Sequence, residues 1–263
     1  MARITQKREY YVVKRNDLIR KSRYSLTVQQ QKMLYYLISQ IKPMDEENKE
    51  YEININEFCK LCGYDTNNGY YYTALKDDLK ALADKSAWID ADDGTSSLFR
   101  WIDTAVIKRN SGVMKIRFHS TVAPYLFELV GFYTQYSLFH LLAMKCKYSM
   151  RMYEYLLSLK YKYQFKVDID ELKKRIDAEN YDKFSHFKVR VLEPAIEEIN
   201  KYTDIQVEYK LVKEGRAYSQ IEFTVKTKGE MAKYIAQTTT ANTLDDTGYF
   251  NQRGKKQKKE SDE

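Results

Sequence analysis

The feature that most constrains the fold is the stretch from Phe187 to Asn200, which reads FKVRVLEPAIEEIN. Drawn as a helix over residues 182–201, this region collects its apolar side chains on one side. Three basic side chains collect on the opposite side, all within the first half of the helix: Lys183, His186 and Arg190. The pattern predicts an amphipathic helix whose outer face begins with positive charge.

Two residues in this stretch need a separate explanation. Lys188 falls nearer the apolar side, so its side chain would have to extend outward to bring the ammonium to solvent or to a phosphate. Pro194 has no backbone N–H and removes the helical hydrogen bond to the carbonyl of Arg190. We therefore expect a kink in the helix at this position.

A β-hairpin pattern follows the helix directly, with strands over 205–212 and 218–226. Apolar and polar residues alternate along the first strand, as a half-buried strand requires. The hairpin carries three cations: Lys210, Lys213 and Arg216. A helix led by cations and followed by a basic hairpin is typical of a winged helix. In that fold the helix enters the DNA major groove and the hairpin meets the backbone. The alternative interpretation is a plain solvated helix face.

The elements expected before this helix also fit a winged helix. Ser149 can cap a helix, and a strand fits residues 165–167. Asp168 or Asp170 can then cap a short helix that ends at Ile176. The order is therefore helix, strand, helix, helix and hairpin, which is the order of a winged helix.

The first half of the chain predicts the same order. Thr27 and Gln30 have the spacing of a capping box at the start of a helix. Gly63 marks the end of a second helix, and Gly69 the start of a third. The expected elements are helices over 27–41, 55–62 and 70–83 and strands over 51–54, 87–90, 98–107 and 113–118. The chain is thus expected to be an α+β protein with two tandem winged-helix domains of similar topology.

The third helix of the first half is less basic than its counterpart in the second half. Its outward residues are Tyr70, Thr73, Lys76, Asp77 and Lys80. The hairpin behind it carries Lys108, Arg109, Lys115 and Arg117. We expect Tyr70, Thr73, the lysines and the arginines to contact the DNA backbone rather than to read bases. The alternative is that this half packs mainly against a partner subunit.

The predicted boundaries divide the chain into five parts. Residues 1–24 form a basic lead-in, 25–120 the first winged-helix domain, 121–136 a connector and 137–228 the second winged-helix domain. From residue 229 onward the chain is polar, with a Thr-rich run and a final lysine cluster. We expect residues 229–263 to be a disordered tail.

Charge and cysteine content limit the functional classes. The formal net charge is +7 and the pI about 9.0, which favours an anionic partner such as nucleic acid. No apolar run approaches the length of a membrane span, and the N-terminus lacks the apolar core of a secretory signal. The odd number of cysteines, three, fits a reducing cytoplasm better than a disulfide framework. The expected location is therefore the cytoplasm.

The sequence offers no pattern for a metal site or an enzyme. Cys59 and Cys62 form a CxxC pair, but a zinc site needs about four ligands and no second pair lies at a suitable spacing. The nine glycines include no GxxxxGK[ST] phosphate loop, and the three histidines include no closely spaced pair. We therefore expect no metal, no cofactor and no catalytic residues.

Three segments resemble one known family. CKYSMRMYEYLLSL (146–159) is similar to the segment that opens the second domain of plasmid replication initiator proteins. FKVRVLEPAIEEIN (187–200) resembles their second recognition helix, including its proline. SLTVQQQKMLYYLISQI (25–41) resembles the first helix of their first domain. The resemblance covers roughly residues 8–226.

This resemblance implies two winged-helix domains of common origin that bind repeated double-stranded sites, called iterons, at a plasmid origin. In that family the monomer opens the origin with host factors, among them the host initiator and the replicative helicase. A homodimer often represses the initiator's own gene. The resemblance also makes Lys183, His186, Lys188 and Arg190 candidate DNA contacts. The alternatives are a dedicated winged-helix repressor, a DNA-nicking replication or recombination enzyme, and an interaction protein whose basic face is incidental.

Overall fold

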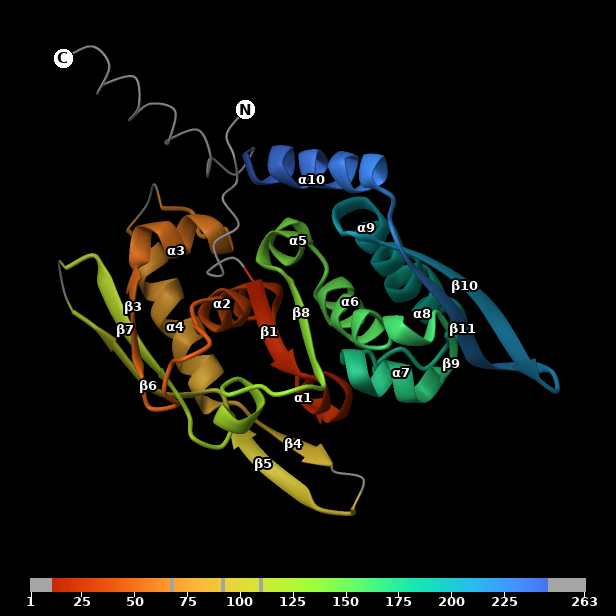
Figure 1. Ribbon diagram of the computed structural model, residues 1–263, viewed down its shortest axis with the longest axis horizontal. Coiled ribbons are helices and arrows are strands. Elements are labelled where there is room, and N and C mark those ends of the chain that lie inside the picture. The colour runs from red at the N-terminus through yellow and green to blue at the C-terminus, as the bar shows by residue number, and fades with distance from the viewer. Residues whose placement is uncertain (1–10, 67–68, 91–92, 109–110, 246–263) are drawn as a thin grey trace, which may run out of the picture.

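A computed structural model describes residues 11–66, 69–90, 93–108 and 111–245. It is a mixed α+β structure in which two winged-helix units lie side by side (Figure 1). The predicted fold class is therefore confirmed. Arg109 and the part of the predicted tail after Asp245 lie outside the described residues. No helix in the described part is long and apolar enough to span a bilayer.

The first unit has the predicted order of elements. Its helices are α2 (Val28–Ser39), α3 (Ile55–Cys62) and α4 (Tyr71–Asp84), and its strands are β3 (Glu50–Asn54), β6 (Ile102–Ile107) and β7 (Val113–Phe118). The strands form an antiparallel sheet in the order β3-β7-β6. The Thr27 hydroxyl accepts the Gln30 N–H and the Gln30 side chain accepts the Thr27 N–H, so the predicted capping box is confirmed. Gly63 ends α3 in the left-handed conformation, with φ of 80°.

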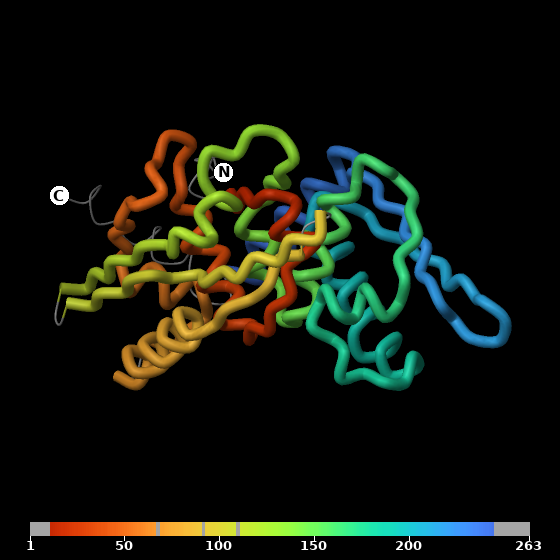
Figure 2. Tube along the Cα trace, turned by 90° about the horizontal axis from the view of Figure 1, so that it is seen from below, coloured from red at the N-terminus to blue at the C-terminus, as the bar shows by residue number. Residues whose placement is uncertain are grey.

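The second unit repeats this topology. Its helices are α6 (Lys147–Ser158), α7 (Ile169–Ile176), α8 (Phe184–Phe187) and α9 (Glu193–Tyr202), with a π-helical turn, η4 (Lys188–Leu192), between the last two. Its strands are β9 (Gln164–Asp168), β10 (Ile205–Glu214) and β11 (Ala217–Thr227), in the order β9-β11-β10. These strands occupy the positions of β3, β6 and β7. The Asp168 carboxylate caps α7 by accepting the N–H groups of Asp170 and Glu171. The two hairpins project from opposite ends of the molecule (Figures 1 and 2).

Two details of the predicted secondary structure are wrong. Helix α6 begins at Lys147, and Ser149 lies buried inside it instead of capping it. The expected strand over 98–107 is two strands, β5 (Ser96–Arg100) and β6, which belong to different sheets. The break falls at Trp101, whose ring is fully buried against Tyr24 and Phe99. Trp101 and the next residue, Ile102, are both buried, so the alternation of buried and exposed side chains is interrupted at this point.

The predicted lead-in and connector are folded together. Strand β1 (Tyr11–Arg15) pairs antiparallel with β8 (Tyr133–Ser137), and α1 (Asn16–Lys21) and α5 (Leu138–Ala143) follow these strands. Strand β2 (Ser22–Arg23) pairs with β4 (Ser86–Asp90), which pairs with β5. The described residues also include the short 3-10 turns η2 (Ala123–Tyr125) and η3 (Lys160–Lys162). Strands β1 and β8 are far apart in sequence and leave no local signal of their pairing. Sequence patterns alone therefore did not reveal this two-stranded unit, which is called the ribbon below.

The expectation of a disordered tail is wrong for its first part. Helix α10 (Glu230–Asp245) lies against α5 and α9 (Figure 1). Its inner side chains Ala236, Thr240 and Leu244 are buried, and the Thr240 hydroxyl donates to the Tyr202 carbonyl at 2.9 Å. Because these contacts are mostly made by small residues, the helix lacks the strong apolar period that identifies a packed helix in sequence.

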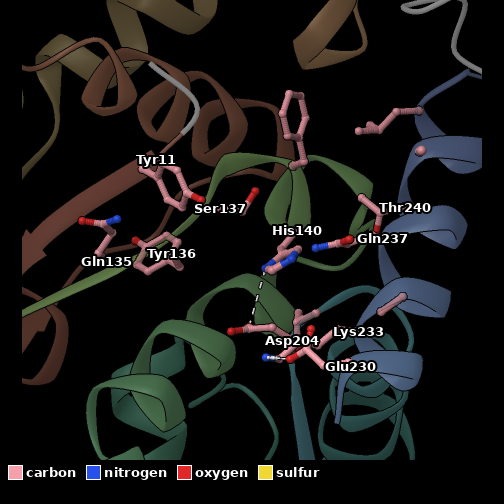
Figure 3. A pocket seen from close by; sticks show the side chains of 15 residues that line it. Tyr11, Gln135, Tyr136, Ser137, His140, Asp204, Glu230, Lys233, Gln237 and Thr240 are labelled. Atoms are coloured by element: carbon pink, nitrogen blue, oxygen red, sulfur yellow. Dashed lines mark hydrogen bonds and ion pairs between the residues drawn. The ribbon is translucent and has the colours of Figure 1, made fainter. Parts of the chain in front are cut away.

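A pocket of about 580 Å³ lies between α10 and the rest of the chain (Figure 3). His140 and Asp204 face Lys233 of α10 across it. The Tyr153 hydroxyl donates to Asp204 Oδ1 at 3.0 Å and lies 3.0 Å from His140 Nδ1. Burial lowers the pKa of His140, which favours the neutral imidazole. This cluster therefore connects α5 to α6 and to the residue before β10.

Candidate nucleic-acid interface

The helical segment of residues 184–202, formed by α8, η4 and α9, is called here the second reading helix. Its inner side is apolar, with Phe187, Val191 and Leu192 fully buried. The outer side chains of Lys183, His186 and Arg190 are exposed and, with residues 180–182, line a shallow hollow of about 330 Å³. The spacing of three and four residues brings these side chains onto one face. The structure thus brings together Lys183, His186 and Arg190, the three side chains that the predicted helix places on one face.

The π-helical turn gives Lys188 a different position from the one expected. The Glu193 N–H donates to the Lys188 carbonyl, a bond that spans five residues instead of four and lies directly before Pro194. The Lys188 ammonium lies 2.7 Å from Glu193 Oε1, which also accepts the Tyr209 hydroxyl at 3.4 Å. The hydrogen bond from Lys188 lowers the pKa of Glu193, and the same contact raises the pKa of Lys188. Lys188 is therefore already paired within the chain.

The hairpin of β10 and β11, the second wing, places its cations in three different settings. Lys210 is exposed and stands opposite Glu222 in the strand register. The Lys213 ammonium lies over the Tyr218 ring, 5.0 Å from its centre. Arg216 lies at the exposed tip beside Gly215, whose φ of 63° suits the tight turn. Among the described residues, neither Arg216 nor Arg190 has a carboxylate partner.

An aromatic contact fixes the second wing to the second reading helix. The ring of Phe184, at the start of the helix, lies 5.2 Å from the ring of Tyr218 on β11. Such aromatic pairs prefer defined relative orientations, so the contact ties the base of the wing to the cationic end of the helix. Sequence reasoning missed Phe184 and Tyr218, because neither carries charge and the pair depends on the folded register.

Helix α4, called here the first reading helix, presents the side chains predicted for it. Tyr70, Thr73 and Lys76 are exposed, and Tyr70 retains 81% of its accessible surface. The Lys80 ammonium pairs with the Asp84 carboxylate one turn later. In Figure 2, α4 and the second reading helix lie on the same side of the molecule.

The hairpin of β6 and β7, the first wing, neutralises most of its described cations internally. Lys115 Nζ lies 3.0 Å from a carboxylate oxygen of both Glu50 and Glu52, and Arg117 Nη2 lies 2.6 Å from Asp103 Oδ2. The strand register places Glu52 opposite Lys115 and Glu50 opposite Arg117. The hydrogen bonds that Lys115 donates to Glu50 and Glu52 raise the pKa of Lys115, and the hydrogen bond from Arg117 lowers the pKa of Asp103.

Lys108 is the exception on the first wing. It is exposed and has no ion-pair partner in the described part of the chain. The carboxylates that pair with Lys115 and Arg117 were not part of the sequence-based site. The alternation of Glu50 and Glu52 on β3 predicted a strand, but not its partner strand or its register, and Asp103 lies on β6.

The two neighbouring cysteines lie in the core. Cys59 and Cys62 are both fully buried on α3, and burial raises the pKa of Cys59 to about 12. A thiol with such a high pKa stays protonated, which is unfavourable for binding a metal ion. Within residues 11–66, 69–90, 93–108 and 111–245, no group of three or more potential ligands gathers at a possible metal site.

Comparison with known families decides the affiliation of the chain. The sequence pattern described as "Initiator Replication protein, WH1" matches residues 11–157, and "Initiator Rep protein, WH2" matches residues 168–225. The chain belongs to the initiator replication protein family. The two matched segments contain the first and second reading helices, respectively.

Individual relatives of this initiator agree with that affiliation. A "Replication initiation protein" of Escherichia coli is 28% identical over 236 residues, which are 85% of this chain and 72% of that protein. The "PI protein" of Escherichia coli is 30% identical over 146 residues, 48% of this chain and 47% of that protein. The crystal structure of Pi initiator protein in complex with iteron DNA has a TM-score of 0.69 and 22% identity, covering 85% of this initiator and 100% of that chain. This structural likeness shows a shared fold.

Proposed function

We propose that this initiator starts plasmid replication by binding repeated double-stranded sites, iterons, at an origin. The observation that carries the proposal is the exposed face of Lys183, His186 and Arg190, which lies beside the second wing with Arg216 at its tip. These groups are cationic or can become so, and both arginines are free to bind an anionic ligand. The crystallised relative with the same fold is bound to iteron DNA.

The arrangement suits duplex recognition in two ways. The guanidinium of Arg190 can read a guanine edge with two parallel hydrogen bonds, while Lys183, Lys210, Lys213 and Arg216 neutralise phosphates. The first reading helix contributes Tyr70, Thr73 and Lys76, and the first wing Lys108, as backbone contacts. Two linked winged-helix units bind DNA more tightly than either unit alone, because the second binding step is intramolecular. Together they would cover about two turns of one side of the duplex.

The resemblance to plasmid initiators extends the proposal to partners. We infer that this initiator acts in the cytoplasm with the host initiator and the replicative helicase, and that a homodimer represses its own gene. We also infer that it binds DNA without cutting it. The second inference separates an initiator of this kind from a nicking enzyme.

Footprinting on the DNA that flanks the gene of this initiator tests the proposal. The expected result is a set of protected repeats, each covering about two helical turns. Absence of any protected site on the flanking DNA would overturn the proposal. Incubation of supercoiled DNA carrying those repeats with a divalent metal ion should leave it uncut, and nicked product would instead support an enzyme.

Initiation and repression require a separate experiment, because both need duplex binding. A DNA circle that carries only the gene, its flanking repeats and a selectable marker should be maintained in a permissive host. If the protein binds the repeats and silences its promoter but never sustains the circle, it is a dedicated repressor.

A further inference from the structure

A fully buried carboxylate lies where the second unit meets the rest of the chain. The Tyr35 hydroxyl donates to Glu154 Oε2 at 2.8 Å, the Tyr136 hydroxyl donates to Glu154 Oε1, and the Lys14 ammonium pairs with the same oxygen. Arg151 Nη1 lies 3.8 Å from Oε2. We call Lys14, Tyr35, Tyr136, Arg151 and Glu154 the junction cluster. None of its members retains more than 4% of its accessible surface.

The members of the junction cluster come from four separate elements. Glu154 and Arg151 lie on α6 of the second unit, and Tyr35 lies on α2 of the first unit. Lys14 and Tyr136 lie on β1 and β8, the strands of the ribbon between the units. Burial, and then the charge of Glu154, raises the pKa of both tyrosines, so their hydroxyls stay protonated and act as donors. A single carboxylate thus holds groups from both units and the ribbon.

Arg151 extends the contact toward β2 and α7. Its guanidinium lies over the Tyr24 ring, 3.9 Å from the ring centre. It also donates to the Ser22 carbonyl at 3.1 Å and to the Arg175 carbonyl at 2.8 Å. These contacts stabilise the buried Arg151 guanidinium, although the cluster has no second carboxylate to pair with it.

A second connection lies nearer the reading helices. The Ser25 hydroxyl donates to Asp177 Oδ2 at 2.7 Å, and Lys147 Nζ lies 2.5 Å from the same oxygen. The Lys85 ammonium donates to the Ser25 carbonyl. Lys85 directly follows the first reading helix, and Asp177 ends α7 shortly before the second. This surface bridge therefore connects the end of one reading helix to the approach of the other.

Polar contacts of this kind influence geometry more than stability. Replacing a buried ion pair by apolar groups is often neutral for stability, because removing both charges from water is costly. Hydrogen bonds are directional, however, whereas apolar packing is not. A carboxylate held by several donors from different elements permits one relative arrangement of those elements and disfavours sliding.

We infer that the junction cluster and the surface bridge hold the two reading helices at a fixed offset, so that the protein measures the spacing between two parts of its DNA site. The inference rests on the proposed function, since it requires both reading helices to contact one duplex. One inserted base pair rotates the two parts by about a tenth of a turn relative to each other. Two rigidly joined reading helices cannot follow that rotation, whereas two loosely joined reading helices can.

The experiment measures the affinity for duplexes with no, one or two base pairs inserted between the two parts of a footprinted repeat. For the unmodified protein, one inserted base pair should weaken binding on the order of a hundredfold, because one of the two reading helices can then no longer contact the duplex while the other is bound. Glu154→Gln, Tyr35→Phe and the double variant Lys14→Met/Glu154→Gln should reduce this penalty to about tenfold or less by letting the readers adjust. In these variants, the affinity for the duplex without an insertion should fall by a smaller factor than the insertion penalty does.

A matched control loses a polar contact within one unit only. The Tyr51 hydroxyl donates to Asp45 Oδ2 at 3.0 Å inside the first unit. Tyr51→Phe should lower thermal stability but keep the full insertion penalty. If Glu154→Gln fails to fold, Tyr35→Phe and the double variant, which removes a positive and a negative charge together, still decide the question.

Two kinds of failure can be told apart. If the unmodified protein binds no duplex, the proposed function is wrong. If it binds the repeat but tolerates inserted base pairs, or if the junction variants keep the same penalty as Tyr51→Phe, the positioning role is wrong and the proposed function stands.

Discussion

The two winged-helix units share one topology but differ in what their cations do. In the second unit, Lys183, Arg190 and Arg216 are free of carboxylate partners within the described residues. In the first unit, Lys80, Lys115 and Arg117 each pair with a carboxylate of the chain itself. The comparison teaches that the number of basic residues on a wing overstates its positive charge when the neighbouring strand carries acidic residues in register.

This difference has a direct consequence for DNA binding. A free cation that contacts a phosphate releases a condensed counterion, and that release makes binding favourable and dependent on salt. A cation already paired with an exposed carboxylate must exchange that partner for the phosphate, so its contribution is smaller. We therefore expect the second unit to provide most of the electrostatic binding and most of the sequence reading.

The largest expected effect is the dependence of affinity on salt. If six or more phosphates are neutralised, affinity should fall by about 10³ or more between 50 and 200 mM salt. Lys183→Ala or Arg216→Ala should each lower the log–log slope by about 0.9, whereas Lys115→Ala or Arg117→Ala should barely change it. Titrations over a range of salt concentrations measure these slopes. A flat slope for the unmodified protein, or equal changes from both units, would contradict the comparison.

The next effect is on specificity. Arg190→Ala should reduce the ratio of specific to random-DNA affinity by about tenfold or more, because it removes a possible bidentate contact to guanine. Lys76→Ala should lower both affinities together, as expected for a phosphate contact. In the structure, Asp78 is turned inward and accepts hydrogen bonds from Tyr64 and Gln30, which leaves Asp77 as the acidic neighbour of Lys76 on the surface. If instead Lys76→Ala selectively loses the repeat, the roles of the two helices are reversed.

A gain of function should follow from removing the carboxylates of the first wing. Glu50→Gln together with Glu52→Gln frees Lys115, so affinity for random duplex should rise a few-fold and the salt slope should increase by up to about 0.9. The same double change in the background of Lys115→Ala is the control and should produce a smaller gain. No increase in either quantity would show that the first wing does not approach DNA.

The smallest effect is expected at Lys188. Although it lies in the second unit, its ammonium is paired with Glu193, as the first-wing cations are with their carboxylates. Lys188→Ala should therefore change affinity and specificity by less than about twofold, close to the range of a surface substitution. A loss as large as that of Arg190→Ala would mean that Lys188 leaves Glu193 when DNA binds.

Local signals in the sequence were reliable where one or two residues determine the geometry. Thr27 with Gln30, Asp168 and Gly63 each act within a few residues of their own position, and each ends or begins a helix as expected. The grouping of Lys183, His186 and Arg190 also follows from helical spacing alone.

Features that depend on distant pairing were missed. The pairing of Lys115 with Glu50 and Glu52 requires the register of β3 on β7, and the β1–β8 ribbon joins strands from either side of the first unit. The position of Lys188 was also unexpected, because the sequence analysis assumed a regular α-helix. The π-helical turn instead places the Glu193 carboxylate beside the Lys188 ammonium. Sequence reasoning therefore predicted the fold and the grouping of Lys183, His186 and Arg190 on one face, but not the charge balance of the candidate site.

The most direct test of the unequal roles scrambles one part of the DNA site at a time. A DNA-cleaving chelate attached to a cysteine introduced at Ala217, on the tip of the second wing, first identifies which part of a footprinted repeat lies under the second unit. Affinities are then measured for duplexes in which only that part, or only the other part, is scrambled. The account predicts that scrambling the part under the second unit costs about tenfold more affinity than scrambling the other. Equal losses, or a larger loss from the part under the first unit, would contradict it.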